Sequence, residues 1–229
     1  MARQPFAPEF SHLSDVIPIF PLAGVLLLPR GSLPLNIFED RYLAMTADVL
    51  KTDDRMIGMI QPTGADDADS IAAAGSNGPA LYDTGCAGRL VQFAESRDGR
   101  YMITLAGILR FRVAEEIEMV RGYRRVRPDW SAFEADMDEE YRRGQFDRDR
   151  LLAALEQYFK AHKIDPNWKA IRDMGDRMLV TSLAMGCPFD PSEKQALLEA
   201  KALPARAEVL TSLLEMSGGL PDASEGTRH

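Results

Sequence analysis

The hydrophobic period of this chain changes once, near Trp130, and that change constrains its fold more than any other feature. Before Trp130, short apolar runs are separated by proline, glycine and aspartate, which is typical of strands. After Trp130, apolar residues recur at helical spacing, which is typical of amphipathic helices. A chain that passes through strands and then through helices is predicted to belong to the α+β class.

The clearest strand pattern is a pair of runs at residues 90–94 and 101–105, which flank an Asp-Gly dipeptide at residues 98–99. Asp-Gly is typical of a type I′ turn, so we expect a tight hairpin here. A second pair of runs, at residues 109–113 and 123–126, continues the pattern. Several short strands of this kind predict a barrel or a sandwich.

Helix boundaries are marked in the second half of the chain. Residues 151–159 have an apolar face at helical spacing. Asp165 followed by Pro166 predicts a helix start, because aspartate caps helices and proline is tolerated in the first turn. Residues 190–193 form a capping box, and Pro204 predicts the start of the last helix.

These patterns divide the chain into consecutive parts. We expect a flexible arm at residues 1–13, a β-barrel subdomain at 14–130, a connector at 131–145, a helical subdomain at 146–218 and a disordered tail at 219–229. The connector is highly charged, and we find no internal repeat.

Composition narrows the class of function. The 229 residues include 45% hydrophobic and 27% charged residues, which is ordinary for a soluble globular protein, and they carry a net charge of −8. An acidic chain is a poor candidate for non-specific binding to nucleic acid or to an anionic membrane. The longest uncharged stretch, residues 16–29, is interrupted by prolines and is shorter than the roughly 20 residues of a membrane helix. We therefore expect a cytoplasmic protein without membrane contact.

No set of residues predicts an enzyme. The chain has no Gly-Lys dipeptide, hence no P-loop, and it has neither GxGxxG nor GxSxG. Cys86 and Cys187 fit no CxxC or zinc spacing, so we expect two buried free thiols. With only three histidines in the chain, we expect no metal site and no cofactor. A small-molecule pocket or enzyme site in the barrel is a weaker hypothesis, since no convergent polar groups are evident.

An RNA-binding module is the alternative hypothesis. Arg110, Arg112, Arg124 and Arg127 would form a basic face if their strands lie side by side, and Tyr123 lies among them. RNA-binding surfaces combine such charges with aromatic stacking. Neighbouring glutamates and the negative net charge favour a solvated strand face instead, so we do not expect nucleic acid as the main partner.

One region is more specific than these patterns. Residues 17–22 read IPIFPL, residues 26–31 read LLLPRG and residues 33–42 read LPLNIFEDRY, with Met45 after them. This region resembles the N-terminal substrate-binding domain of ATP-dependent Lon proteases. The family pattern runs P-L-F-P-L, then L-F-P-G, then L-P-L-x-I-F-E-x-R-Y-x-x-M.

Later residues agree with this resemblance. Residues 98–113, DGRYMITLAGILRFRV, are similar to the family's hairpin and to its G-x-x-R-F-x-[IV] strand, and residues 194–199 resemble its helical tail. The resemblance covers about residues 14–217. Two departures are Asp40, where the family commonly has proline, and Arg30, which intervenes in the L-F-P-G turn.

The resemblance implies a PUA-like β-barrel followed by an α-helical bundle. It implies a protein that binds unfolded or partly folded polypeptides or protein partners, as an adaptor or holdase in protein quality control, with a proteolytic machine among its candidate partners. Lon proteases continue into an ATPase and a Ser–Lys peptidase domain that this sequence does not contain. We therefore expect a stand-alone, non-catalytic member, and the sequence leaves its oligomeric state open.

Most motif residues are expected to shape the fold, since prolines remove amide donors and fix turns. These structural residues are Pro21, Pro29, Glu39, Arg41, Tyr42, Gly107, Arg110 and Phe111. We expect Phe38 and Tyr42 to open a helix packed on the barrel, and Glu39 to pair with Arg110 across the fold.

The candidate polypeptide-binding residues are Leu33, Pro34, Leu35 and Phe38. A groove beside this segment, with exposed apolar surface, would hold an extended or unfolded polypeptide.

Overall fold

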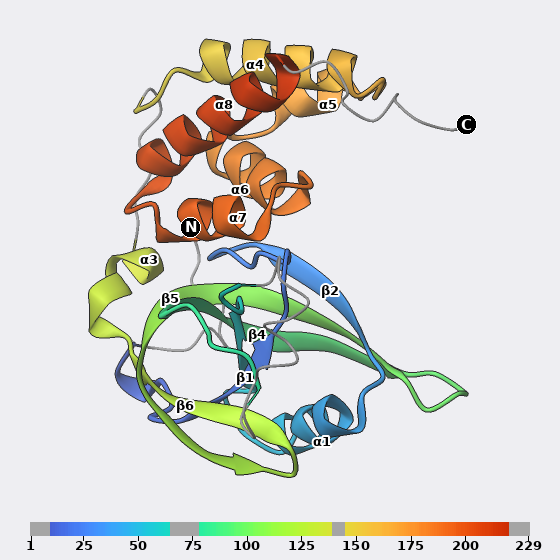
Figure 1. Cartoon of the computed structure of the whole chain (residues 1–229), viewed down its shortest axis with the longest axis vertical. Coiled ribbons are helices and arrows are strands. Elements are labelled where there is room, and N and C mark those ends of the chain that lie inside the picture. The colour runs from blue at the N-terminus through green and yellow to red at the C-terminus, as the bar shows by residue number, and fades with distance from the viewer. Residues whose placement is uncertain (1–9, 65–77, 139–144, 220–229) are drawn as a thin grey trace. The chain divides into compact units, whose positions relative to one another are not determined.

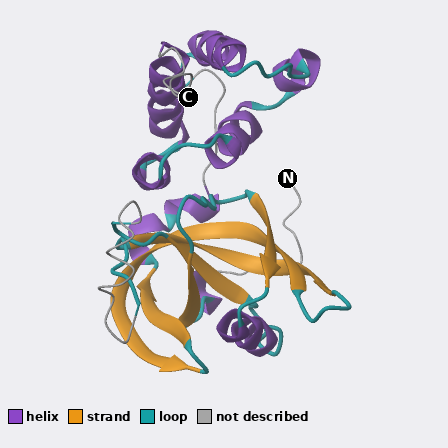
Figure 2. Ribbon diagram, turned by 45° about the vertical axis from the view of Figure 1, so that its right-hand side comes forward, coloured by secondary structure: helices purple, strands orange, loops and turns teal. Residues whose placement is uncertain are grey.

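Strands fill the first half of the described chain and helices the second, as the change of hydrophobic period predicts (Figure 1). The computed structural model describes residues 10–64, 78–138 and 145–219. The chain divides into two compact units, residues 1–139 and residues 140–229. Every strand of the sheet belongs to the first unit (Figure 2), so the α+β class is confirmed.

One six-stranded sheet forms the first unit. Its strands are β1 (Ile17–Pro21), β2 (Ser32–Ile37), β3 (Met56–Ile60), β4 (Thr84–Glu95), β5 (Tyr101–Val120) and β6 (Tyr123–Asp129). The strand order is β2-β5-β4-β3-β1-β6, and β5 also pairs with β6. This additional pairing exists because β5 is long: its first part lies between β2 and β4, and its last part pairs with β6. The two runs predicted at 101–105 and 109–113 are therefore one continuous strand.

The predicted β4–β5 hairpin is confirmed, but its turn is not of type I′. A type I′ turn needs a positive φ at both central residues. Gly99 has a φ of 80°, whereas Asp98 is not among the residues with positive φ. The Gly99 N–H donates to the carbonyl of Ser96 at 3.0 Å. The loop is thus a type I turn followed by a left-handed glycine, a common three-residue hairpin connection.

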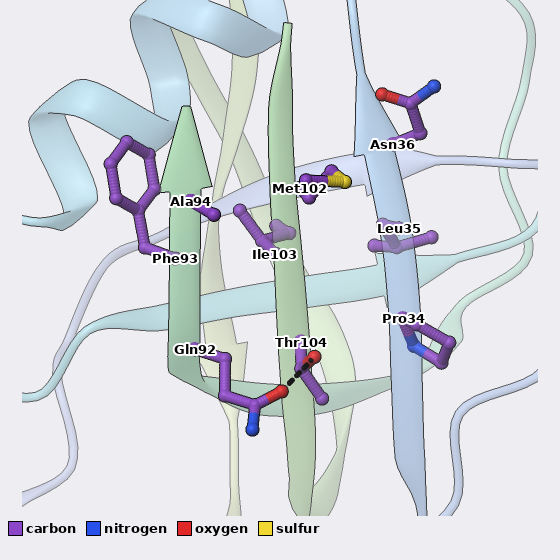
Figure 3. Close-up of a pocket in the computed structure, with 9 residues that line it drawn as sticks. All are labelled: Pro34, Leu35, Asn36, Gln92, Phe93, Ala94, Met102, Ile103 and Thr104. Atoms are coloured by element: carbon purple, nitrogen blue, oxygen red, sulfur yellow. Dashed lines mark hydrogen bonds between the residues drawn. The ribbon is translucent and has the colours of Figure 1, made fainter. Parts of the chain in front are cut away.

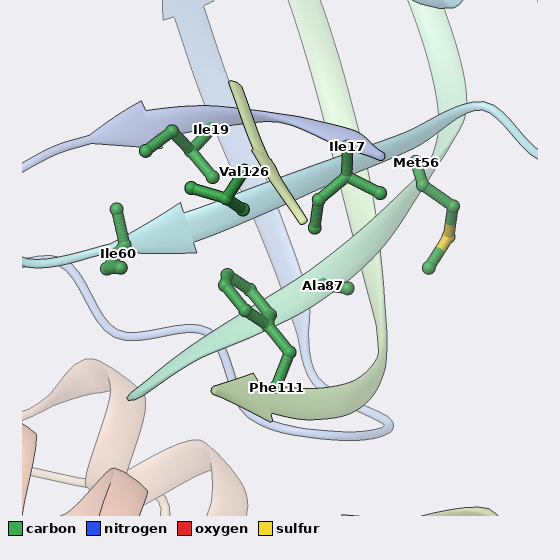
Figure 4. Close-up of a cluster of buried hydrophobic side chains, with 7 residues drawn as sticks. All are labelled: Ile17, Ile19, Met56, Ile60, Ala87, Phe111 and Val126. Atoms are coloured by element: carbon green, nitrogen blue, oxygen red, sulfur yellow. The ribbon is translucent and has the colours of Figure 1, made fainter. Parts of the chain in front are cut away.

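Apolar side chains from five strands fill the core of the first unit (Figure 4). The cluster consists of Ile17, Ile19, Met56, Ile60, Ala87, Phe111 and Val126. Phe111 is completely buried, and its ring meets the ring of Trp130 edge to face, with centroids 5.9 Å apart. The motif residue Phe111 therefore contributes to packing.

Helix α1 (Asp40–Val49) packs against this sheet through Tyr42, whose ring centroid lies 4.1 Å from that of Phe20. Tyr42 is buried, as predicted. Phe38 precedes the helix and is 63% exposed, so the prediction that it opens the packed helix is wrong. The helix begins later because Glu39 is its N-cap, with extended backbone angles.

Short helices flank the sheet in sequence. The predicted arm lies mostly outside the described residues, apart from the 3₁₀ helix η1 (Phe10–His12). The predicted connector contains the 3₁₀ helix η2 (Ser131–Phe133) and helix α3 (Ala135–Asp138).

In the described residues of the second unit, all regular secondary structure is helical. Its helices are α4 (Arg148–Ala161), α5 (Trp168–Asp173), α6 (Asp176–Gly186), α7 (Pro191–Glu199) and α8 (Leu203–Gly219). Helix α8 packs against α4, α6 and α7. None of the helices in the described ranges is long and apolar enough to cross a bilayer.

The N-caps observed for α7 and α5 test two of the predicted helix starts. The capping box of α7 is confirmed, with Asp190 and Glu193 in reciprocal contact with the backbone. The predicted cap at Asp165 is wrong, because the Asn167 side chain accepts the Ala170 N–H at 3.1 Å and caps α5 instead.

Candidate functional site

Three adjacent strands of the first unit, β2, β5 and β4, form an apolar pocket that opens to solvent (Figure 3). Its volume is about 550 Å³. The lining residues are Pro34, Leu35, Asn36, Gln92, Phe93, Ala94, Met102, Ile103 and Thr104. One of these strands, β2, contains three of the four predicted binding residues, Leu33, Pro34 and Leu35.

Strand register places the lining side chains on two faces. The Thr104 hydroxyl donates to Oε1 of Gln92 at 2.8 Å, so these two side chains share one face, as Figure 3 shows. Successive strand residues alternate between faces. The residues that share the face of Thr104 are Pro34, Asn36, Gln92, Ala94 and Met102, whereas Leu35, Phe93 and Ile103 belong to the opposite face.

Six of the nine lining residues lie on the face of Thr104, which we call the pocket face. On β5, in the middle of the three strands, the pocket face is exposed at Met102, whereas the opposite face is buried at Ile103. Met102 is 54% exposed, although it is a large apolar residue. Ile103, its neighbour on the other face, is 2% exposed. Exposed apolar side chains at a concave surface are typical of binding sites.

The pocket is accessible because the strands extend past their neighbours. In the described residues, β3 pairs with β4 only between Cys86 and Arg89. Beyond a register shift between Leu90 and Gln92, β4 has β5 as its strand partner. Val91 and Phe93 there are 53% and 42% exposed. The extended ends of β4 and β5, with β2 beside them, therefore present apolar surface to solvent.

The chemistry of the lining is neutral. Its polar side chains are the amides of Asn36 and Gln92 and the hydroxyl of Thr104. None of the lining residues is a carboxylate, an amine, a guanidinium, an imidazole or a thiol. Such a surface can bury apolar groups and hydrogen-bond to neutral ones, but it offers no side chain suited to general acid–base catalysis.

Two of the four predicted binding residues, Pro34 and Leu35, line the pocket. Leu33 lies on the same strand with a half-buried side chain, and Phe38 is exposed beyond the end of the strand; neither lines the pocket. Sequence reasoning missed Met102, although its place at an alternate position of a half-buried strand indicates an outward side chain.

Glu39 and Arg110 do not pair, contrary to the prediction. Glu39 binds Arg41, two residues later, with Oε2 2.7 Å from the guanidinium. Arg110 binds Asp136, with a shortest N–O distance of 2.7 Å. Glu39 is at the surface next to α1, whereas Arg110 is buried and faces the segment that follows β6.

Other motif residues hold the loop between β1 and β2 against β5. The Gly107 N–H donates to the Gly31 carbonyl, and the Arg30 N–H donates to the Gly107 carbonyl, both at 2.8 Å. A Cβ on Gly107 would lie 2.0 Å from the Leu28 oxygen. This close approach explains the glycine, and Pro29 lies in the turn that makes it. Pro21 ends β1.

Three of the four arginines of the RNA hypothesis, Arg110, Arg124 and Arg127, pair with acidic side chains. Both oxygens of Glu116 bind Arg124, each at 2.6 Å. Arg127 pairs with Glu115 at 3.3 Å. Together with the buried pair of Arg110, these contacts neutralise much of the predicted basic face.

Both cysteines are buried and neither is part of a disulfide, as predicted. Burial raises the pKa of the Cys187 thiol to about 11, while the charge of Lys194 acts in the opposite direction. A thiol that stays protonated at neutral pH is a poor nucleophile.

The model of the family described as "ATP-dependent protease La (LON) substrate-binding domain" matches residues 16–216. Lon protease 2 from Myxococcus xanthus is 30% identical over 106 residues, which are 46% of this chain and 12% of that protein. Lon protease from Xanthomonas oryzae pv. oryzae is 23% identical over 219 residues, which are 93% of this chain and 24% of that protein. The chain therefore spans less than a quarter of the length of either relative.

Solved structures share the fold. The Lon N-terminal domain protein from Xanthomonas campestris has a TM-score of 0.58 at 21% identity, covering 86% of this chain and 97% of that one. The N-terminal domain of a Mycobacterium avium complex Lon protease has a TM-score of 0.55 at 11% identity, covering 87% and 97%.

Proposed function

Since the chain belongs to the ATP-dependent protease La (LON) substrate-binding domain family, we propose that it binds unfolded or partly folded polypeptides in the pocket formed by β2, β5 and β4. Family membership supports a substrate-binding role. The exposed, uncharged apolar surface around Met102 is the observation that supports this pocket as the site of polypeptide binding.

Unfolded polypeptides suit this surface because they expose apolar side chains that folded proteins bury. Removing apolar area from water contributes about 25 cal/mol per Å², which requires neither a metal nor a nucleophile. A methionine at the centre suits a surface that must accept different side chains, since its thioether chain is flexible and polarisable.

The role proposed is that of a non-catalytic adaptor or holdase, with a proteolytic machine as a partner that receives the bound chain. The neutral lining supports this role, because it offers no side chain for peptide hydrolysis. The proposed architecture is a PUA-like barrel followed by a helical bundle. It is supported by the pairing of β5 with both β4 and β6, and by the packing of α8 on three other helices.

Fluorescence anisotropy tests this function with the whole chain. A labelled, permanently unfolded polypeptide is titrated with the protein, alongside a labelled, stably folded control protein and a labelled RNA. Saturable binding to the unfolded polypeptide alone supports the proposal. Absence of binding to the unfolded polypeptide contradicts the proposal. Binding to RNA alone, with an affinity that decreases steeply as salt increases, would favour the RNA hypothesis instead.

A further inference from the structure

The pocket adjoins an open strand edge. Within the described ranges, β2 pairs only with β5, from Ser32 opposite Ala106 to Ile37 opposite Tyr101. The second edge of β2 therefore has no strand partner among these residues. Open edges present backbone N–H and C=O groups that can pair with another chain.

The register shows which backbone groups point outward along this edge. When the β2–β5 register is continued by one residue, Gly31 lies opposite Gly107, and the Gly107 N–H donates to the Gly31 carbonyl, so this is a hydrogen-bonded position of the ladder. Hydrogen-bonded pairs alternate along an antiparallel ladder, which turns the backbone groups of Ser32, Pro34 and Asn36 away from β5. Pro34 agrees with this assignment, because a residue without an N–H is tolerated where the N–H would face outward.

The edge thus offers an incomplete set of hydrogen-bonding groups. Ser32 and Asn36 each present an N–H and a C=O, whereas Pro34 presents only its C=O. All three residues are exposed. An added strand could form a ladder here, with one bond missing in the middle.

Apolar surface lies on both faces beside this edge. On the pocket face, an added strand would meet Pro34 and Met102. On the opposite face, it would cover Leu33 and Leu35, which are only half-buried at the edge of the sheet. Successive residues of an added strand point to alternate faces, so each of them would meet apolar side chains.

We infer that the bound polypeptide adds to the free edge of β2 as an extended strand, and that it is recognised as an uninterrupted run of uncharged, apolar, β-prone residues. This inference rests on the proposed function and specifies its mode of binding. A run that is apolar on both faces is typical of strands in parallel sheets, which are buried on both faces, and unfolding exposes such runs. Strand addition obtains affinity from the main chain, so it tolerates many sequences.

Two peptides that differ only in the positions of their backbone N-methyl groups test directly whether binding occurs by strand addition. The probe is a short peptide of valine, leucine and threonine with a lysine at each end. One version has two N-methyl groups on alternate residues and keeps one edge intact. Its isomer has them on adjacent residues, which blocks both edges. Strand addition predicts that the first isomer binds like the unmethylated peptide and that the second binds about tenfold more weakly.

A substitution at Pro34 tests whether the outward-facing backbone groups of β2 bind the peptide. Pro34→Val restores the missing N–H and keeps an apolar, β-prone residue at the pocket. Strand addition predicts binding of the unmethylated peptide that is about threefold to tenfold tighter, through one added hydrogen bond. Sedimentation of the variant checks that it does not self-associate through the same edge.

The outcomes separate this inference from the proposed function. If the unfolded polypeptide binds but the two methylated isomers bind equally, strand addition is overturned and the proposed function stands. Unchanged or weaker binding by Pro34→Val, in a sample that stays monodisperse, also overturns strand addition. If neither the peptide nor the unfolded polypeptide binds, both proposals fail.

Discussion

Arg110 on β5 and Asp136 in α3 form a buried bidentate ion pair, with side chains 2% and 8% exposed. Nη2 of Arg110 lies 2.7 Å from Oδ1 and Nε lies 2.8 Å from Oδ2. The Asp136 carboxylate also accepts the Arg110 backbone N–H at 3.1 Å. The guanidinium carbon lies 4.4 Å from the ring centroid of Phe133. The pair therefore ties the segment that follows β6 to the middle of β5.

Replacement of Asp136 by alanine is expected to destabilise the first unit by about 3–5 kcal/mol, because it leaves a buried guanidinium without its anion. Denaturant unfolding followed by tryptophan fluorescence measures the change. The control is Glu115→Ala, which removes the exposed pair with Arg127 and is expected to cost less than about 1 kcal/mol. Equal losses in the two variants would contradict this account of the pair.

Substitution of Gly107 tests the close approach of the β1–β2 loop. A methyl group there would lie 2.0 Å from the Leu28 oxygen, so Gly107→Ala must displace backbone. We expect a loss of more than about 2 kcal/mol of unfolding free energy, in the range of overpacked sites. Gly186→Ala in α6 is the matched control, since no atom beyond its chain neighbours and its own helix backbone lies within 4 Å of the added Cβ. Comparable unfolding free energies of the two variants would contradict this prediction, because they would show that the β1–β2 loop can move to accommodate the methyl group.

Alkaline pH is expected to weaken folding through Cys187. Burial raises the pKa of this thiol to about 11, above the ordinary value of about 8.5. Between these values the unfolded chain releases a proton that the folded chain keeps, so the unfolding free energy falls as pH rises. Burial also lowers the pKa of Lys194, which acts with the opposite sign in this range. Denaturant unfolding at a series of alkaline pH values measures this dependence. The decrease of the unfolding free energy with pH should be smaller in Cys187→Ala than in the unsubstituted protein, and an equal decrease in the two would refute the assignment.

Local patterns predicted the elements that local interactions determine. The β4–β5 hairpin follows from alternating apolar residues around Asp98-Gly99, and the α7 start follows from the capping box at Asp190. The turn type was wrong because Asp-Gly is compatible with two hairpin loops, and the strand register selects between them.

Partners that are distant in sequence could not be predicted in the same way. Asp136 lies 26 positions after Arg110 in an acidic segment that reads as a solvated connector, and only the fold makes it a buried partner. The pocket required the register of three strands, since Pro34, Met102 and Ala94 share a face only after β2, β5 and β4 align. The sequence predicted the hairpin of β4 and β5, but the predicted binding residues lie on only one of the three strands, β2.

Polypeptide binding is expected to depend weakly on salt. The pocket lining contains no charged side chain, so binding should not release counterions or lose screened attractions. Titrations of the unfolded polypeptide between low and high salt should give dissociation constants within about twofold of each other. A steep decrease in affinity would indicate binding at a charged surface elsewhere.

Comparison of Met102→Glu with Met178→Glu tests the central claim most directly. Both methionines are exposed, at 54% and 63%, but Met102 lies in the pocket and Met178 lies on α6. Thermal unfolding first establishes that both variants are folded, and anisotropy of the unfolded polypeptide then gives the affinities. The account predicts about tenfold weaker binding for Met102→Glu, because a carboxylate must be desolvated, and no change for Met178→Glu. Unchanged binding by a folded Met102→Glu variant would contradict the assignment of the pocket.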